Sequence, residues 1–83
     1  MMKPTIHLNG TSQRELELEA REAYDAVDKA IEAMCRMTVH GRDYYPQGNE
    51  ATHEAIREHR ARIAKLQSVK DDLEELVLAV MKF

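Results

Sequence analysis

The sequence has almost none of the residues that cross-link small proteins or bind zinc in them. Its 83 residues include a single cysteine, Cys35, so no internal disulfide is possible, and the four histidines show no zinc-binding spacing. A chain of this size gains little net stability from one hydrophobic core. We therefore expect self-association to stabilise it. Cys35 lies in the apolar run Ala33-Met34-Cys35-Arg36-Met37, which predicts a small buried side chain.

Long apolar segments are also missing. The N-terminus has no apolar region of the secretory type, and no run approaches the roughly 18 residues that span a membrane. These absences predict a cytoplasmic protein without a membrane partner. The net charge of −3 argues against general binding to nucleic acids, which favours basic domains.

Glycine and proline occur only near the N-terminus and in one central segment, at Pro4, Gly10, Gly41, Pro46 and Gly48. Residues 1–11 alternate in polarity at Thr5-Ile6-His7-Leu8 and then reach the turn dipeptide Asn9-Gly10. They predict an extended arm that lies along the rest of the chain or pairs with the arm of another copy. Residues 12–83 predict an all-α hairpin, with helices at about 12–39 and 50–82 and a loop at 40–49.

The first predicted helix has a clear start and a continuous apolar face. Ser12 and Glu15 have the spacing of a capping box. Apolar residues then recur with heptad spacing at Leu16, Ala20, Ala23, Val27, Ala30, Met34 and Met37, and Tyr24 and Ile31 widen this face.

The second predicted helix begins with Asn49 as its cap and contains no glycine or proline. Its apolar positions are Ile56, Ile63, Leu66, Val69, Leu73, Leu76 and Val80. His59 occupies a position in this series that favours an aliphatic residue. The segment 76–80 is apolar around most of the helix, and such a helix is normally buried. Two or more hairpins packed into a helical-bundle homo-oligomer would bury both faces.

Charge is unevenly distributed along the hairpin. Residues 29–65 carry seven Lys or Arg and five acids, whereas the rest of the chain carries five bases and ten acids. A fold centred near residue 45 predicts cross-helix pairs between Asp25 and Lys65 and between Asp28 and Arg62. It also makes the loop end basic and the opposite end acidic.

The loop Gly41-Arg42-Asp43-Tyr44-Tyr45-Pro46-Gln47-Gly48-Asn49 is the best candidate for a binding site. Tyrosine rings stack on bases, a guanidinium suits phosphate, and the start of a helix attracts anions. The candidate ligand-binding residues are Arg42, Asp43, Tyr44, Tyr45, Arg57, His59 and Arg60. A structural interpretation is also open, in which the tyrosines cap the core, Asp43 pairs with an arginine, and His59 is a hydrogen-bonded core histidine.

Metal binding and catalysis have weaker support. Glu50 and His53 form an E-x-x-H unit of the kind that holds di-iron centres in bundles, and Glu32 is the best-placed additional carboxylate. No second such unit occurs, so no metal or cofactor is predicted. We find no catalytic triad, Cys-His pair, phosphate loop or pair of catalytic carboxylates, which predicts a protein that is not an enzyme.

The segments Ile6-His7-Leu8-Asn9-Gly10-Thr11-Ser12, Gly41–Gly48 and Glu58-His59-Arg60-Ala61-Arg62 resemble a family of small proteins of tailed phages and prophages. The resemblance spans nearly the whole chain and implies a host bacterial cytosol. In size and architecture the chain is also similar to the oligomeric phage sponges that sequester cyclic nucleotide signals of bacterial immunity.

Two hypotheses follow from these features. In the first, the basic tyrosine-containing loop binds an anionic, nucleotide-like ligand, and the protein acts as an anti-defence sponge. In the second, the chain binds only proteins, as an inhibitor of a host enzyme or as a virion or packaging adaptor.

Overall fold

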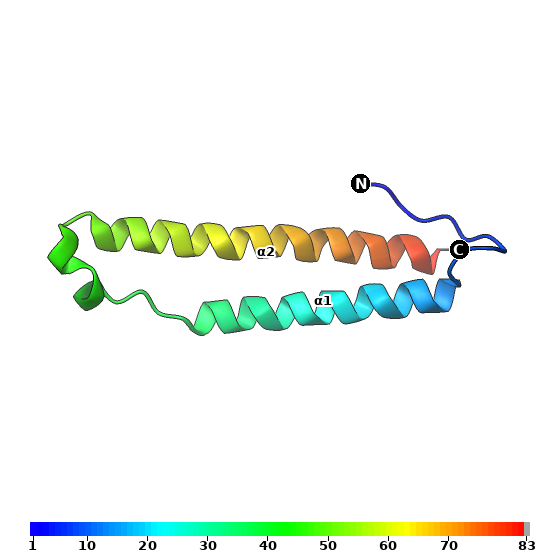
Figure 1. Cartoon of the computed structure of the whole chain (residues 1–83), viewed down its shortest axis with the longest axis horizontal. Coiled ribbons are helices and arrows are strands. Elements are labelled where there is room, and N and C mark those ends of the chain that lie inside the picture. The colour runs from blue at the N-terminus through cyan, green and yellow to red at the C-terminus, as the bar shows by residue number, and fades with distance from the viewer. Residues whose placement is uncertain (83) are drawn as a thin grey trace.

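The protein forms a long helical hairpin in a computed structural model that describes residues 1–82 (Figure 1). Helix α1 spans Gln13–Arg36 and helix α2 spans Ala51–Met81. They lie antiparallel, and two 3₁₀ turns, η1 (Gly41–Asp43) and η2 (Tyr45–Gln47), lie between them. The predicted all-α hairpin is confirmed for the single chain. No helix within residues 1–82 is long and apolar enough to cross a membrane.

Helix α1 begins as predicted. Ser12 is the N-cap, and its side chain accepts a hydrogen bond from the Glu15 backbone N–H at 3.2 Å. This bond satisfies one of the four N–H groups that a helix leaves free at its start.

Helix α1 ends at Arg36, three residues before the predicted boundary at 39. Met37 is extended, and the β-branched residues Thr38 and Val39 favour extended backbone. An extended residue advances about 3.3 Å, against 1.5 Å in a helix. Residues 37–40 therefore carry the chain past the first turns of α2 before it turns back (Figure 1).

This extended segment changes the register of the two helices. The Lys70 ammonium pairs with Asp28 at 2.6 Å, and Arg62 pairs with Glu58 on its own helix at 3.7 Å. The predicted pair between Asp28 and Arg62 is therefore wrong. Nor do Asp25 and Lys65 form an ion pair among residues 1–82. The prediction assumes equal lengths of chain on both sides of residue 45, whereas an extended segment follows α1 and none precedes α2 in the described chain.

The start of α2 also differs from expectation. Glu50 precedes the helix in an αR conformation, and no side chain caps it, so the predicted Asn49 cap is wrong. Gly48 has φ 118°, a conformation that L side chains rarely adopt, and it allows the chain to reverse into α2.

The interface between the helices contains very few buried residues. Among residues 1–82 only Ala20, Val77 and Val80 are buried, and the other interface positions are half-buried. The hairpin measures 61 × 20 × 17 Å, and its radius of gyration is 18.6 Å. A compact domain of this length has a radius of gyration of about 12 Å.

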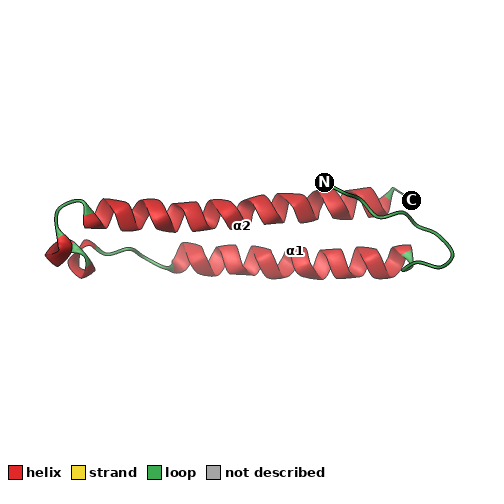
Figure 2. Ribbon diagram, turned by 45° about the horizontal axis from the view of Figure 1, so that its top comes forward, coloured by secondary structure: helices red, strands yellow, loops and turns green. Residues whose placement is uncertain are grey.

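The N-terminal arm has no regular structure and lies along the hairpin at its open end, where α1 begins and α2 ends (Figures 1 and 2). Met2, Lys3 and Pro4 line a hollow together with Leu16, Leu76 and Val80. Lys3 also pairs with Glu75 at 3.4 Å. Of the two predicted positions for the arm, the single chain adopts the first.

Candidate functional site

The predicted ligand-binding residues lie at the closed end of the hairpin, where η1 and η2 connect the helices. Arg42 and Asp43 lie on η1, and Tyr45 begins η2. Tyr45 is 71% exposed, whereas Tyr44 is half-buried. The two tyrosines therefore differ: Tyr44 contributes to packing, and Tyr45 presents a ring to solvent.

Arg42 and Asp43 are both exposed, and no ion pair joins them or ties either to another residue in the described chain. The expected pairing of Asp43 with a neighbouring arginine is therefore not formed. Arg42 and Tyr45 remain as one cation and one aromatic ring on consecutive turns, both accessible from solvent.

Arg57 and Arg60 lie further along α2, about 9 Å and 14 Å past its first residue. Arg57 forms an ion pair with Glu54 on the same helix, so part of its charge is already compensated. Arg60 is exposed. These two arginines lie on α2, whereas Arg42 and Tyr45 lie on the turns before it.

His59 faces α1 rather than the loop. Its Nε2 atom lies 2.8 Å from the backbone carbonyl oxygen of Met34, and since that oxygen only accepts, Nε2 carries the hydrogen. The same oxygen accepts the Met37 backbone N–H at 3.2 Å. His59 thus adds a second hydrogen bond to a carbonyl in the last turn of α1, which matches the structural interpretation of this residue.

Two other expectations concern metal binding and the cysteine. No group of three or more metal-ligating side chains occurs among residues 1–82, so Glu50, His53 and Glu32 do not form the di-iron arrangement weighed above. Cys35 is exposed, and the prediction that it is buried is wrong. It follows Met34, which faces α2, and successive residues of a helix point about 100° apart.

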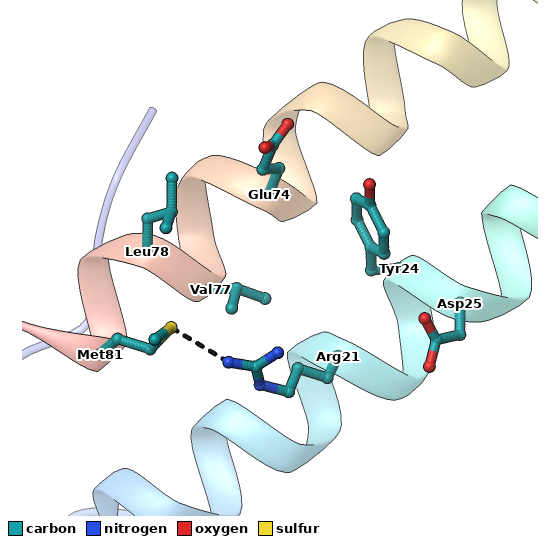
Figure 3. Close-up of a pocket in the computed structure, with 7 residues that line it drawn as sticks. All are labelled: Arg21, Tyr24, Asp25, Glu74, Val77, Leu78 and Met81. Atoms are coloured by element: carbon teal, nitrogen blue, oxygen red, sulfur yellow. Dashed lines mark hydrogen bonds between the residues drawn. The ribbon is translucent and has the colours of Figure 1, made fainter.

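The open end contains features that sequence reasoning missed. A hollow of about 400 Å³ lies between the helices and is lined by Arg21, Tyr24, Asp25, Glu74, Val77, Leu78 and Met81 (Figure 3). Arg21 from α1 reaches the Met81 sulfur of α2 at 3.1 Å across this hollow. The apolar segment 76–80 indicated that this end is suited to association. Only the register of the helices shows which residues of α1 face that segment.

Lys70 forms a charged cluster next to this hollow. Its ammonium donates a hydrogen bond to Asp28 and lies 5.3 Å from the centre of the Tyr24 ring. The hydrogen bond to Asp28 raises the pKa of Lys70 above its ordinary value of 10.5, with a smaller opposing effect of desolvation. The ammonium therefore stays charged at neutral pH, and the cluster fixes the register of α1 against α2.

No protein-family model, curated protein or solved structure matches this chain. The surface of the hairpin itself is therefore the basis on which we infer its function.

Proposed function

We propose that this protein is a self-associating helical interaction module that acts by binding other molecules and not by catalysis. The observation that carries the proposal is the small core, which consists of Ala20, Val77 and Val80 within the described residues. Large apolar side chains on both helices remain at least 46% exposed, namely Leu18, Val69, Leu78 and Met81.

The total surface supports the same proposal. A compact monomer of 9.6 kDa exposes about 5,100 Å², whereas this chain exposes 6458 Å². The excess is similar to the area that each chain buries in an extensive protein interface. Binding of another protein surface, in the first place that of a second copy, would cover it.

The test is the molar mass in solution. Light scattering after size-exclusion chromatography at about 10–100 µM, which is at least 10-fold above a Kd of about 1 µM, is expected to give at least twice the chain mass of 9.6 kDa. A monomer over the whole range would contradict the proposal.

A second candidate function is binding of an anionic, nucleotide-like ligand at the closed end. The observation that favours it is the pair of exposed groups Arg42 and Tyr45, which have no ion-pair or ring partner among residues 1–82. The guanidinium suits a phosphate, and the ring suits a base. With the resemblance to phage proteins, this suggests sequestration of a cyclic nucleotide signal.

Thermal shift and calorimetry against cyclic di- and trinucleotides and ADP-ribose derivatives test this candidate. A ligand at 100 times its Kd raises the free energy of unfolding by about 2.7 kcal/mol. Arg42→Ala is expected to weaken binding about 10- to 100-fold, because a charge-assisted hydrogen bond contributes about 1.5–3 kcal/mol. Tyr45→Ala should also weaken it.

Arg14→Ala is the matched control, since it removes one exposed positive charge at the opposite end of the hairpin. It is expected to leave the affinity unchanged. If no compound in the panel stabilises the wild-type protein, or if Arg14→Ala and Arg42→Ala weaken binding equally, the closed-end site is wrong.

A further inference from the structure

One side of the hairpin carries an apolar face that is formed mainly by α1, with Glu19 between Leu16 and Ala23. Leu16 of α1 and Leu76 of α2 mark this side, because both line the hollow beneath the N-terminal arm. Seven-residue steps from Leu16 lead to Ala23, Ala30 and Met37, and a step back from Leu76 leads to Val69. We call the exposed residues of this side the outer apolar face; they are Ala23, Ala26, Ala30, Ala33, Met37 and Val69.

The arm covers the open end of this side and leaves the rest free. Its residues Met2, Lys3 and Pro4 pack near Leu16 and Leu76. The stretch of α1 from Ala23 to Arg36, about 20 Å of helix, has no such cover.

Charged residues without ion-pair partners flank this face. On α1, Glu22 lies one turn before Ala26, and Arg36 lies one turn after Ala33. On α2, Lys65 and Asp72 lie on either side of Val69. All four are exposed, and none forms an ion pair within residues 1–82.

Two charged residues on the opposite side of α1 have partners within the chain. Arg21 pairs with Glu17, and Asp28 pairs with Lys70. Asp25 and Glu32 on that side have no ion-pair partner within residues 1–82, so the proposal depends on the complementarity of the four charges beside the outer apolar face.

We propose that a second copy of this chain binds the outer apolar face in reversed orientation, so that α1 packs antiparallel on α1 of the partner and α2 on α2. The proposal rests on the self-association proposed above and specifies its surface and direction. A twofold axis near residue 29 of α1 brings Glu22 of each copy to Arg36 of the other.

The same axis matches the charges of α2. Asp28 pairs with Lys70, so residue 29 lies close to the level of residue 69. An axis at that level brings Lys65 of one copy to Asp72 of the other. One twofold axis thus brings Glu22 to Arg36 and Lys65 to Asp72, and it also places the exposed Lys29 of one copy near Lys29 of the other.

An arrangement in which both copies point in the same direction lacks this complementarity. It would place the two open ends side by side. The residues outside 29–65, which include those ends, carry ten acids and five bases. Like charges facing each other oppose association.

The dimensions of the free part of the face agree with a small, reversible interface. Alanines let two helices approach to the short end of the usual 8–10 Å range. The stretch of α1 that the arm leaves free is about 20 Å long, and the hairpin is 20 Å wide. The free part of the face therefore covers about 400 Å² per chain, about half of the roughly 800 Å² that each partner buries in a standard interface.

Disulfide cross-linking tests the orientation. In a Cys35→Ser background, Ala23→Cys chains mixed with Ala33→Cys chains are expected to form disulfide-linked dimers under mild oxidation. Each variant alone is expected to give no linked dimer, because ten residues of helix separate like positions by about 15 Å, beyond the reach of a disulfide.

The outcomes separate this proposal from the one on which it rests. Self-linking of Ala23→Cys or of Ala33→Cys alone would overturn the reversed orientation. A dimer by light scattering without linkage in the mixture would overturn the chosen face and leave self-association standing. A monomer by light scattering would overturn both proposals.

A substitution on the face supplies a second readout. Ala30→Glu places two carboxylates near the proposed axis. It is expected to raise the Kd of the dimer at least 10-fold, as measured in a dilution series. Ala64→Glu is the matched control, because Ala64 is also exposed and lies on the side of α2 that carries Leu78. Equal effects of the two substitutions, or no effect of Ala30→Glu, would contradict the proposed face.

Discussion

A Val80→Asp chain is expected to lose at least about 3 kcal/mol of its free energy of unfolding, because it would bury a carboxylate without a partner. Val80 is 1% exposed, the lowest exposure of the three buried residues in the described chain. It also lies beside Leu16 and Leu76, where α1, α2 and the arm meet. For a domain of this size the loss corresponds to at least about 12 °C in Tm, measured by circular dichroism at 222 nm.

Leu78→Asp is the control for this experiment. Leu78 is two residues away on the same helix and 50% exposed, so its carboxylate would remain hydrated. Its effect is expected to be within about 0.5 kcal/mol. Equal losses in the two variants would mean that the open end does not contain the core of the hairpin.

A His59→Ala chain is expected to lose about 2–3 kcal/mol, because it loses both the ring that packs between the helices and the hydrogen bond to the Met34 carbonyl. His59→Leu keeps apolar volume and should lose only about 1 kcal/mol or less, since the Met37 N–H still binds that carbonyl. Urea denaturation measures both values.

His53→Ala is the matched substitution at an exposed histidine of the same helix, and it is expected to change stability by less than about 0.5 kcal/mol. A ligand-binding role for His59 makes a different prediction. In that case His59→Leu would abolish ligand binding at the closed end while its stability stayed near that of the wild type.

The two ends of the hairpin suggest a division of roles. The open end holds all three buried residues of residues 1–82 and the arm, and the Lys70 cluster lies nearer the middle of the hairpin; together they fix the helices in register. The closed end exposes Arg42 and Tyr45 on short turns. A ligand site on these turns would therefore lie apart from the buried residues that hold the helices together.

Features set by neighbouring residues could be read from the sequence. The Ser12 cap follows from a side chain and an N–H three residues apart, and the helices follow from heptad spacing without glycine or proline. The chain reversal near Gly48 has the same local origin. Each depends on contacts within one or two helical turns, so the local pattern is sufficient.

Features set by distant residues required the tertiary structure. The pairing of Asp28 with Lys70, the exposure of Cys35 and the hydrogen bond from His59 to Met34 all depend on where α1 ends and how far residues 37–40 extend. Heptad spacing shows which side of each helix is apolar but leaves the sliding of one helix along the other undetermined. That position depends on the summed packing and ion pairs between the helices, and those contacts exist only when both helices are in place.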